Sequence, residues 1–333
     1  MEGKILILAV GGLGDLIRVF PLLVSLKKRG PGNKIFLLTS YSATVEVFSL
    51  LRPEFRSAGF YYWPLHCQNP LRRLWEKIRV LGWVRSKRFD LLCDTSRGTG
   101  WKGNYRLGRL SGAKIKVGFS YASLGKAYDF CVPFALDKPL VEQNLALLSV
   151  LGLPAILSFG LKDDFPSPEK GKDFWVLHPG AQNPERNPPV SFWKKVIKNL
   201  KELYPQLEPV IIGGPQEASL REILRIRRGY FGLRLEELAG LIRRSRFFIG
   251  VDSGPLHLAV ALQKPTVGLF GPTCPLQVVG KWPFFEAVSA EVSCAPCYRH
   301  LPEETINCRN ALCIKTLSVE ALLEKIQKIT SKD

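Results

Sequence analysis

Three short motifs in the second half of the chain place small and polar residues directly after apolar runs of strand length. The motifs are His178–Gly180 with Arg186, Gly213–Glu217 and Val251–Ala259. Backbone N–H groups beside glycine can approach a phosphate closely, and a helix N-terminus adds partial positive charge. Arg186 can add a bidentate contact to the same anion, and Glu217 has the chemistry to bind ribose hydroxyls. Each motif alone could be an ordinary turn, but together they predict a nucleotide-binding cleft.

Another glycine turn, Gly11–Gly14, comes directly after the first apolar run, and Asp15 is the next residue. A dinucleotide-binding fingerprint would need glycine where Ile17 stands and an acid after the second strand, and the sequence has neither. No Gly-Lys-Ser/Thr ends a glycine loop, so a P-loop is excluded as well. Two interpretations stay open. Asp15 is a proton acceptor kept ionised by the amides of the turn, or an ordinary acid in a first helical turn.

Apolar runs of strand length alternate with helical patterns in both halves of the chain, which predicts parallel sheets with helices on both faces. The predicted strands are Ile5–Val10, Ile35–Thr39, Phe60–Trp63, Leu91–Asp94, Ile115–Phe119, Phe174–His178, Pro209–Gly213, Phe247–Asp252 and Thr266–Phe270. The predicted helices are Asp15–Arg29, Leu71–Arg88, Val190–Leu203, Gln216–Arg227, Leu235–Arg244, Pro255–Leu262 and Val319–Ile329. The expected fold class is therefore α/β, with two doubly wound, Rossmann-like parallel-sheet domains facing one another across a cleft. Their expected bounds are 1–160 and 161–317, with a linker over Gly160–Lys172 and a final helical segment over 318–333.

The 333-residue chain carries a net charge of +18, and this charge is unevenly spread. Between Arg52 and Tyr128 there are 16 Lys or Arg against 4 Asp or Glu, a net +12. Such a field attracts nucleic acid, an anionic membrane surface or a phosphorylated substrate, and a generally basic soluble protein is the plain alternative. Nucleic acid is disfavoured as a partner, because no known nucleic-acid-binding module occurs in the sequence.

The most basic stretch, Leu71–Arg88, also has apolar residues at helical spacing. These are Leu71, Leu74, Trp75, Ile78 and Leu81. A basic amphipathic helix with Trp suits the interface of an anionic membrane. The alternative is an ordinary helix that turns its apolar face to the core. No apolar run is long enough to span a bilayer, and the first run lacks the features of a signal peptide. We therefore expect a cytoplasmic protein, peripheral at the inner face of the cytoplasmic membrane.

Four sequence segments together resemble the motifs of the glycosyltransferase family 9 heptosyltransferases. The segments are Gly12–Leu23 (GLGDLIRVFPLL), His178–Gly180 with Arg186, Val251–Ala259 (VDSGPLHLA) and Gly268–Thr273 (GLFGPT). The resemblance covers essentially the whole chain in the same order. It implies a GT-B fold and an inverting, metal-independent transfer that uses no cofactor. The implied substrates are an ADP-heptose-like nucleotide-sugar donor and a lipid-linked anionic glycan acceptor, the lipopolysaccharide core or lipid A.

The resemblance also implies roles for particular residues, with the acceptor in the N-terminal domain and the donor in the C-terminal one. By similarity Asp15 is the general base, and Arg186 stabilises the leaving diphosphate where the family usually has Lys. Asn187 also departs from the family pattern, which often has an aromatic residue there before Pro188. The implied donor-site residues are Gly180, Arg186, Gly214, Glu217, Asp252, Ser253, Gly254, His257 and Thr273. The expected acceptor-site residues are Gly12, Gly14, Arg72, Arg73 and Arg97.

Two further questions stay open at the level of sequence. The cluster Cys294, Cys297, Cys308 and Cys313 could ligate a structural zinc ion, form disulfides, or remain as reduced thiols. The paired domains could also belong to a nucleotide-sugar epimerase or hydrolase, which would consume donor without acceptor. A basic nucleic-acid-binding protein is the less favoured alternative, and it would show steeply salt-dependent binding.

Overall fold

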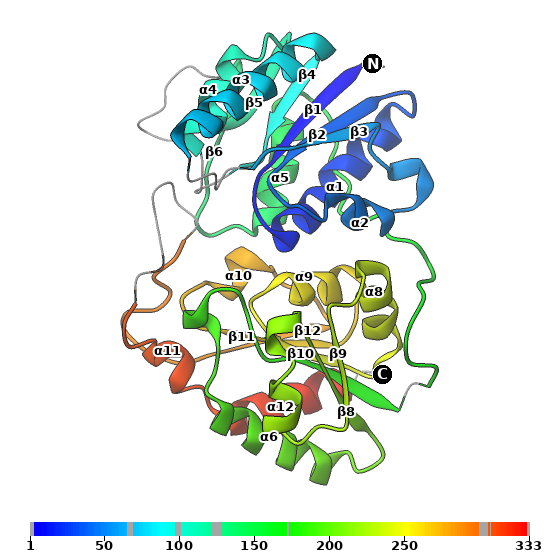
Figure 1. The fold of residues 1–333 in the computed structure, drawn as a ribbon, viewed down its shortest axis with the longest axis vertical. Coiled ribbons are helices and arrows are strands. Elements are labelled where there is room, and N and C mark those ends of the chain that lie inside the picture. Colours follow the sequence, from blue (N-terminus) through cyan, green and yellow to red (C-terminus); the bar gives the residue numbers. More distant parts are fainter. Residues whose placement is uncertain are drawn as a thin grey trace. The chain divides into compact units, whose positions relative to one another are not determined.

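The computed structural model describes residues 3–64, 69–96, 101–120, 128–171, 173–299, 306 and 308–331. These residues form two compact units, one up to Lys162 and the other from Asp163 onward. Each unit is a parallel sheet with helices against both faces (Figure 1). In the part of the chain that is described, no helix has both the length and the apolar character needed to cross a membrane.

The first unit contains six strands in the order β3-β2-β1-β4-β5-β6. The strands are β1 (Lys4–Ala9), β2 (Lys34–Thr39), β3 (Gly59–Tyr62), β4 (Leu91–Asp94), β5 (Ile115–Ser120) and β6 (Phe130–Pro133). The helices are α1 (Leu13–Arg29), α2 (Thr44–Ser49), the 3-10 turn η1 (Pro53–Phe55), α3 (Pro70–Lys87), α4 (Trp101–Leu110) and α5 (Leu140–Ser149). The strand order reverses between β1 and β4, so the turn after β1 lies at the kind of edge where α/β sheets bind ligands.

Alternation along β1 explains how this sheet is covered. Leu6 and Leu8 point to the face where they join Val80 and Val84 of α3 in one apolar cluster. The opposite face is covered by α1 and α5, which pack against one another. Because both faces are buried, β1 and β2 are nearly continuous apolar runs, as central parallel strands are expected to be.

The second unit contains six strands in the order β12-β11-β10-β7-β8-β9. The strands are β7 (Phe174–His178), β8 (Glu208–Gly213), β9 (Arg228–Phe231), β10 (Phe248–Val251), β11 (Thr266–Phe270) and β12 (Phe285–Ser289). The helices are α6 (Val190–Leu203), α7 (Leu220–Ile223), α8 (Leu235–Arg244), α9 (Gly254–Ala261), α10 (Pro275–Val278), α11 (Leu312–Lys315) and α12 (Val319–Thr330), with 3-10 turns η2 (Pro184–Arg186) and η3 (Pro215–Glu217). The strand order here reverses between β7 and β10.

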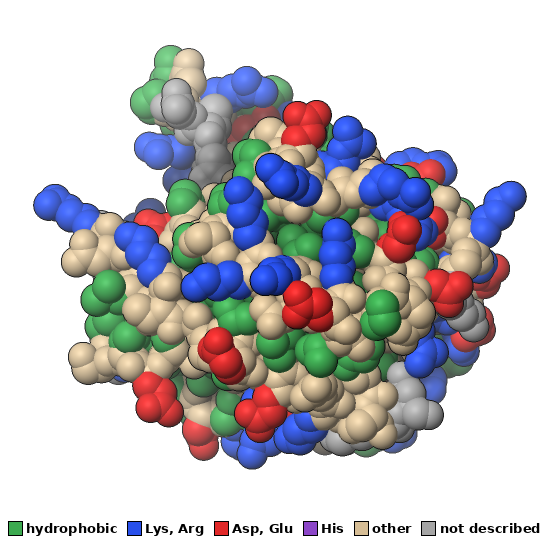
Figure 2. Space-filling view, turned by 90° about the horizontal axis from the view of Figure 1, so that it is seen from below, with side chains coloured by type: hydrophobic (Ala, Val, Ile, Leu, Met, Phe, Trp, Pro, Cys, Tyr) green, Lys and Arg blue, Asp and Glu red, His purple; other side chains and the backbone are tan. Residues whose placement is uncertain are grey.

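The core of the second unit lies between its sheet and the helices α6 and α12. Trp175 of β7 and Trp193 of α6 are both almost fully buried there, and Trp175 stacks on Phe247. The outer surface over α6 and α12 carries basic side chains interspersed with acidic and apolar ones rather than gathered in one patch (Figure 2). Because the core lies between the sheet and the helices α6 and α12, the terminal helix α12 completes this unit.

The expected fold class, two doubly wound parallel sheets, is confirmed, but some predicted elements were wrong or missing. The predicted helix Gln216–Arg227 is broken into η3 and the short α7. It ends there because Leu224 and Ile226 both turn into the core, while Arg225 between them adopts a positive φ of 53°. The expected linker Gly160–Lys172 contains the boundary between the two units, and it packs closely where it is described: Phe165 is buried, and the Pro166 carbonyl lies against Gly240.

Candidate donor site and acceptor residues

The three motifs of the second half lie side by side at one edge of the second sheet. They follow β7, β8 and β10, and the strand order places β10 beside β7 and β7 beside β8. Because all three strands are parallel, their carboxyl ends meet at the same edge. This edge includes the point where the strand order reverses, the usual ligand position in such sheets.

Glu217 is fixed between two of the glycine motifs. Its Oε2 accepts a hydrogen bond from the Gly214 N–H at 2.7 Å, in a capping box at the start of η3. A Cβ on Gly180 would lie only 1.7 Å from Glu217 Oε1, and one on Gly213 only 2.9 Å from Oε2. Glycine at these positions therefore makes room for the carboxylate, which remains partly exposed.

Asp252 is the centre of a buried polar network behind the N-terminus of α9. Thr273 Oγ1 donates to Asp252 Oδ2 at 2.7 Å, Arg186 Nη1 lies 3.2 Å from the same oxygen, and His257 Nε2 lies 3.6 Å from Oδ1. Burial alone would raise the pKa of Asp252. The charge of Arg186 and the hydrogen bonds of His257 and Thr273 outweigh this effect and hold the pKa well below its ordinary value. Asp252 is therefore ionised at neutral pH, although it is only 2% exposed.

This network brings three of the expected donor-site residues together. Asp252, His257 and Thr273 are buried and engaged with one another. They hold Arg186 and the helix N-terminus in place, and their contact with a donor stays a prediction. Arg186 also donates to the Asp252 carbonyl at 3.1 Å, and about a fifth of its side chain stays exposed.

His178 joins the first motif to the third. Its Nδ1 lies 2.9 Å from Ser253 Oγ, and Ser253 Oγ donates to the Val251 carbonyl at 3.0 Å. Since the Ser253 proton is used there, the His178 ring is the donor in the first bond. Burial lowers the pKa of His178 to about 4, so the ring is neutral at physiological pH. His178 belongs to the first of the three sequence motifs, but no role was predicted for it; its position as the last residue of a strand beside the reversal point was the signal for one.

In the first unit, Asp15 is the third residue of α1. Its Oδ2 accepts from the Gly12 N–H at 2.9 Å, and its Oδ1 lies 2.5 Å from Arg18 Nη2. The carboxylate thus caps the helix and is also 41% exposed, so both interpretations left open by the sequence are compatible with its geometry. Gly11 has a φ of +148°, and a Cβ there would lie 2.2 Å from Asp15 Oδ2. Gly14 lies in the same first turn of α1.

The other expected acceptor residues lie on α3 or outside the described residues. Arg72 and Arg73 are exposed in the first turn of α3, while Arg97 is not among the described residues. In an ordinary amphipathic helix the apolar residues would face the core. Several apolar residues of α3 face solvent instead. Leu71, Leu74, Trp75 and Ile78 are 78%, 57%, 55% and 62% exposed. The core-facing side consists of Glu76, Val80 and Val84 instead.

Of the four clustered cysteines, Cys294 and Cys297 are exposed, Cys308 is partly buried and Cys313 is buried. Within the described ranges, no group of three or more His, Cys, Asp or Glu side chains is arranged to hold a metal ion. Burial raises the pKa of Cys313, and the neighbouring Cys297, Cys294 and Cys308 raise it further.

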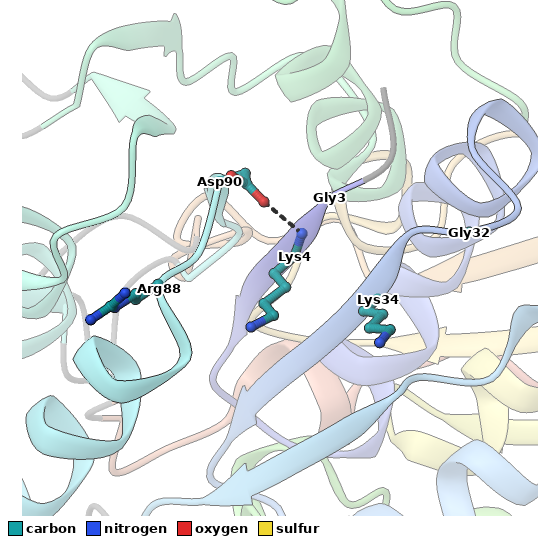
Figure 3. Close-up of a pocket in the computed structure, with 6 residues that line it drawn as sticks. All are labelled: Gly3, Lys4, Gly32, Lys34, Arg88 and Asp90. Atoms are coloured by element: carbon teal, nitrogen blue, oxygen red, sulfur yellow. Dashed lines mark hydrogen bonds between the residues drawn. The ribbon is translucent and has the colours of Figure 1, made fainter.

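A separate cavity of about 320 Å³ lies at the opposite edge of the first sheet, where β1 and β2 begin. It is lined by Gly3, Lys4, Gly32, Lys34, Arg88 and Asp90 (Figure 3). Asp90 accepts from the Lys4 N–H at 2.9 Å and pairs with Lys114 at 2.7 Å. Because ligands of open α/β sheets bind beyond the carboxyl ends of the strands, this cavity is not the candidate site.

Comparisons with known proteins agree with this architecture. Residues 106–306, more than half of the chain, match the model of glycosyltransferase family 9 (heptosyltransferase). Lipopolysaccharide heptosyltransferase 3 of Escherichia coli is 27% identical over 286 residues, which cover 78% of this chain and 81% of that protein.

Two solved structures share the fold over nearly the full length of both chains. The family 9 glycosyl transferase from Veillonella parvula superposes with a TM-score of 0.76 at 16% identity, covering 100% of this chain and 99% of the other. The E. coli heptosyltransferase WaaC with ADP has a TM-score of 0.72 at 16% identity, covering 98% and 99%. The fold is thus that of the GT-B heptosyltransferases. The chain belongs to glycosyltransferase family 9, and it is a heptosyltransferase.

Proposed function

We propose that the enzyme transfers heptose, with inversion and without a metal, from an ADP-heptose-like donor to a lipid-linked lipopolysaccharide core acceptor. The second unit binds the donor, and the first unit binds the acceptor. The observation that carries the proposal is the buried network of Asp252, Arg186 and Thr273 behind the N-terminus of α9. The Asp252 carboxylate stays ionised there although it is almost fully buried. It orients the partly exposed guanidinium of Arg186 at the edge where the strand order reverses.

The proposed chemistry uses this edge for the leaving group. As the bond between the anomeric carbon and the diphosphate breaks, negative charge grows on the diphosphate. Arg186 and the free N–H groups at the start of α9, near Gly254, would stabilise that charge. Glu217, fixed over Gly180, would accept hydrogen bonds from the ribose hydroxyls. The nucleotide named in the WaaC structure, ADP, is consistent with a site of this class.

Asp15 supplies the other half of the reaction. The acceptor hydroxyl attacks the anomeric carbon from the face opposite the diphosphate and must lose its proton as the new bond forms. The Asp15 carboxylate, which is 41% exposed, would accept that proton. Attack from the opposite face inverts the configuration, and every proton and leaving group is accounted for without a further reactant.

The acceptor side is supported by the surface of α3. Four apolar side chains, Leu71, Leu74, Trp75 and Ile78, are exposed on this helix beside Arg72, Arg73 and Lys77. Apolar anchors flanked by cations match the interface of an anionic bilayer. We therefore place the enzyme at the inner face of the cytoplasmic membrane, where a lipid-linked acceptor carrying phosphates would be presented.

The first experiment tests the proposed substrates. ADP and ADP-heptose should raise the melting temperature more than the UDP and GDP counterparts, because a ligand that binds only the folded state stabilises it. Heptose should appear on a lipid-linked core acceptor only when both substrates are present. Rapid consumption of the donor without acceptor would instead identify an epimerase or hydrolase.

The second experiment tests the proposed base. Asp15→Asn keeps an oxygen that can accept from the Gly12 N–H, so the helix cap survives. Transfer should fall by ~10²–10⁴-fold while ADP affinity stays the same. Asp137→Asn, at an exposed site in the same unit, is the matched charge control. Near-parental turnover in Asp15→Asn would exclude this residue as the base.

A further inference from the structure

Arg18 is an arginine buried in the body of α1. It is only 6% exposed, whereas arginine side chains are mostly exposed and are almost never fully buried unless they are paired. Its Nη2 lies 2.5 Å from Asp15 Oδ1, one helical turn toward the start of α1. A buried cation needs a partner, and this one is paired with the residue to which we assign proton transfer.

The contacts around the pair leave Asp15 little freedom. One carboxylate oxygen is held by Arg18, and the other accepts from the Gly12 N–H at 2.9 Å. On the far side of the helix turn, Asn144 Nδ2 of α5 donates to the Arg18 carbonyl at 2.9 Å, and Asn144 is itself buried. The Arg18 backbone is thus tied to α5 while its side chain reaches back to Asp15.

Other charges near α1 do not perform the same task. The elements packed against α1 carry the acids Glu46 on α2, Glu54 on η1 and Glu142 on α5, and all three are exposed. The remaining basic residues of α1, Lys27, Lys28 and Arg29, lie in its last turn. Arg18 is therefore the cation of α1 that sits one turn from Asp15.

We propose that Arg18 is a positioning residue for proton transfer: it holds the Asp15 carboxylate ionised and in one orientation. The inference rests on the proposed role of Asp15 as the base. The pair has a second consequence for an acceptor that carries phosphates. A bare carboxylate would repel such an acceptor, whereas a carboxylate neutralised by a buried guanidinium lets it approach.

The test compares Arg18→Gln, which keeps a hydrogen-bond donor without the charge, with Arg18→Lys, which keeps the charge on a different stem. Lys28→Gln removes the same charge from an exposed site at the other end of α1. We expect kcat to fall by roughly 10–100-fold in Arg18→Gln, since a base displaced by about 1 Å can lose that much. Arg18→Lys should recover most of the rate, Lys28→Gln should match the parent, and the donor KM should stay constant in all three.

A second readout does not depend on activity. The carboxyl signal of Asp15 is followed by carbon NMR in the full chain, and it is assigned by its absence from Asp15→Asn. In Arg18→Gln its titration should move to higher pH, because an opposite charge that favoured the ionised form is gone. In Arg18→Lys and Lys28→Gln it should stay near the parental position.

The outcomes separate the two ideas. If the Asp15 signal titrates alike in the parent and in folded Arg18→Gln, or if kcat is unchanged, Arg18 is not a positioning residue and the inference fails. If the signal moves as expected but Asp15→Asn still transfers heptose at the parental rate, the inference about the pair holds and the assignment of the base fails. Should Arg18→Gln not fold, as judged by the loss of a cooperative urea-unfolding transition, Arg18→Lys and Lys28→Gln decide: the rate and the Asp15 titration must stay near the parental values in both.

Discussion

The His178 ring and the Ser253 hydroxyl meet at 2.9 Å, across the point where the strand order of the second sheet reverses. His178 is the last residue of β7, and Ser253 is the N-cap residue of α9. One hydrogen bond therefore ties a strand end to the helix N-terminus at which we place the donor diphosphate. The bond requires a proton on Nδ1, and a neutral ring supplies it without placing a second cation beside Arg186.

This relationship predicts a pH dependence of stability. The pKa of His178 is about 4 in the folded protein and 6.5 in its ordinary state, so the unfolded chain binds more protons between these values. Stability should therefore fall as pH drops from 6.5 toward 4, by up to about 3 kcal/mol from this residue. Urea unfolding of the parent and of His178→Gln across this range gives the free energy of unfolding at each pH. The effect is the difference between the two proteins in the slope of that free energy against pH.

The Asp252 carboxylate does not interfere with that measurement. Its folded pKa is held below its ordinary value of 3.8, so the stability that it contributes is lost only as pH falls below about that value. The two windows are separate. Parallel stability curves for parent and His178→Gln between pH 6.5 and 4 would contradict the buried, neutral state of His178.

Gly180→Ala should displace Glu217. The added Cβ would overlap Glu217 Oε1 at 1.7 Å, so the carboxylate must leave its position on the Gly214 N–H. We expect ADP affinity to fall by about tenfold or more, since a lost hydrogen bond to a charged group is worth roughly 1.5–3 kcal/mol. Gly171→Ala is the control, because a Cβ there meets nothing within 4 Å. Calorimetry that finds equal ADP affinity in both variants would remove Glu217 from the nucleotide site.

Much of the fold was predictable because the central strands are buried on both faces. The runs that became β1, β7, β10 and β11 are apolar almost throughout, and such runs are typical of parallel sheets. The strands that were missed, β6, β9 and β12, lie at the sheet edges, where one side is unpaired and partly exposed. β9 (RGYF) and β12 (FEAVS) lack a continuous apolar run, so pairing to a neighbour decides that they are strands. β6 (FCVP) is apolar but short, mostly exposed and ends at a proline.

The motifs of the candidate site could be placed for the same reason. Glycines and polar residues directly after apolar strands predicted that the three motifs would meet, and they lie together at one sheet edge. The sequence could not show which polar groups turn inward, because the partners are far apart along the chain. Asp252 is bound by Arg186, 66 positions earlier, and by Thr273, 21 positions later. That pairing, rather than residue type, makes Asp252 a buried support.

Arg186→Ala should lower both ADP affinity and stability. It removes the cation at the exposed edge and leaves the buried Asp252 charge uncompensated, which costs about 3–5 kcal/mol for a fully buried pair. Arg186→Lys keeps the charge and should be milder in both respects. Arg227→Ala is the matched control: it breaks the exposed pair with Glu208, which should be worth about 0–1 kcal/mol. Equal ADP affinity in Arg186→Ala and Arg227→Ala would exclude Arg186 from the site.

Chelation should leave the rate of heptose transfer unchanged. In the proposed reaction, Arg186 and the start of α9 stabilise the leaving diphosphate, so no step assigns that task to a divalent cation. Transfer is measured after dialysis against EDTA, with and without added magnesium or manganese. Loss of transfer that either ion restores would mean that the catalytic class is wrong.

The last prediction concerns the exposed face of α3 and separates its apolar part from its charge. Leu71→Ser with Trp75→Ser and Ile78→Ser should weaken binding to vesicles containing anionic lipid at every salt concentration. Arg72→Glu with Arg73→Glu and Lys77→Glu should weaken it most at low salt, because salt screens exposed charges. At about 1 kcal/mol per basic residue, the loss of three cations alone lowers affinity roughly 100-fold, and the three new carboxylates add repulsion from the anionic lipid. Arg79 is left in place, since it covers Trp75 and pairs with the buried Glu76.

Two measurements connect this surface with catalysis. Both triple variants should raise KM for a lipid-linked acceptor presented in vesicles, while ADP affinity and KM for a soluble, deacylated acceptor stay at the parental values. Val45→Ser on α2 and Leu203→Ser on α6 remove exposed apolar side chains from other surfaces and should change neither value. The soluble acceptor is the decisive comparison, because it retains the sugar and phosphate groups and lacks only the membrane. If the variants used vesicles as well as the parent does, the exposed leucines and Trp75 would have no membrane role. If they lost activity equally on both acceptors, α3 would bind the glycan itself, and the membrane would not be its partner.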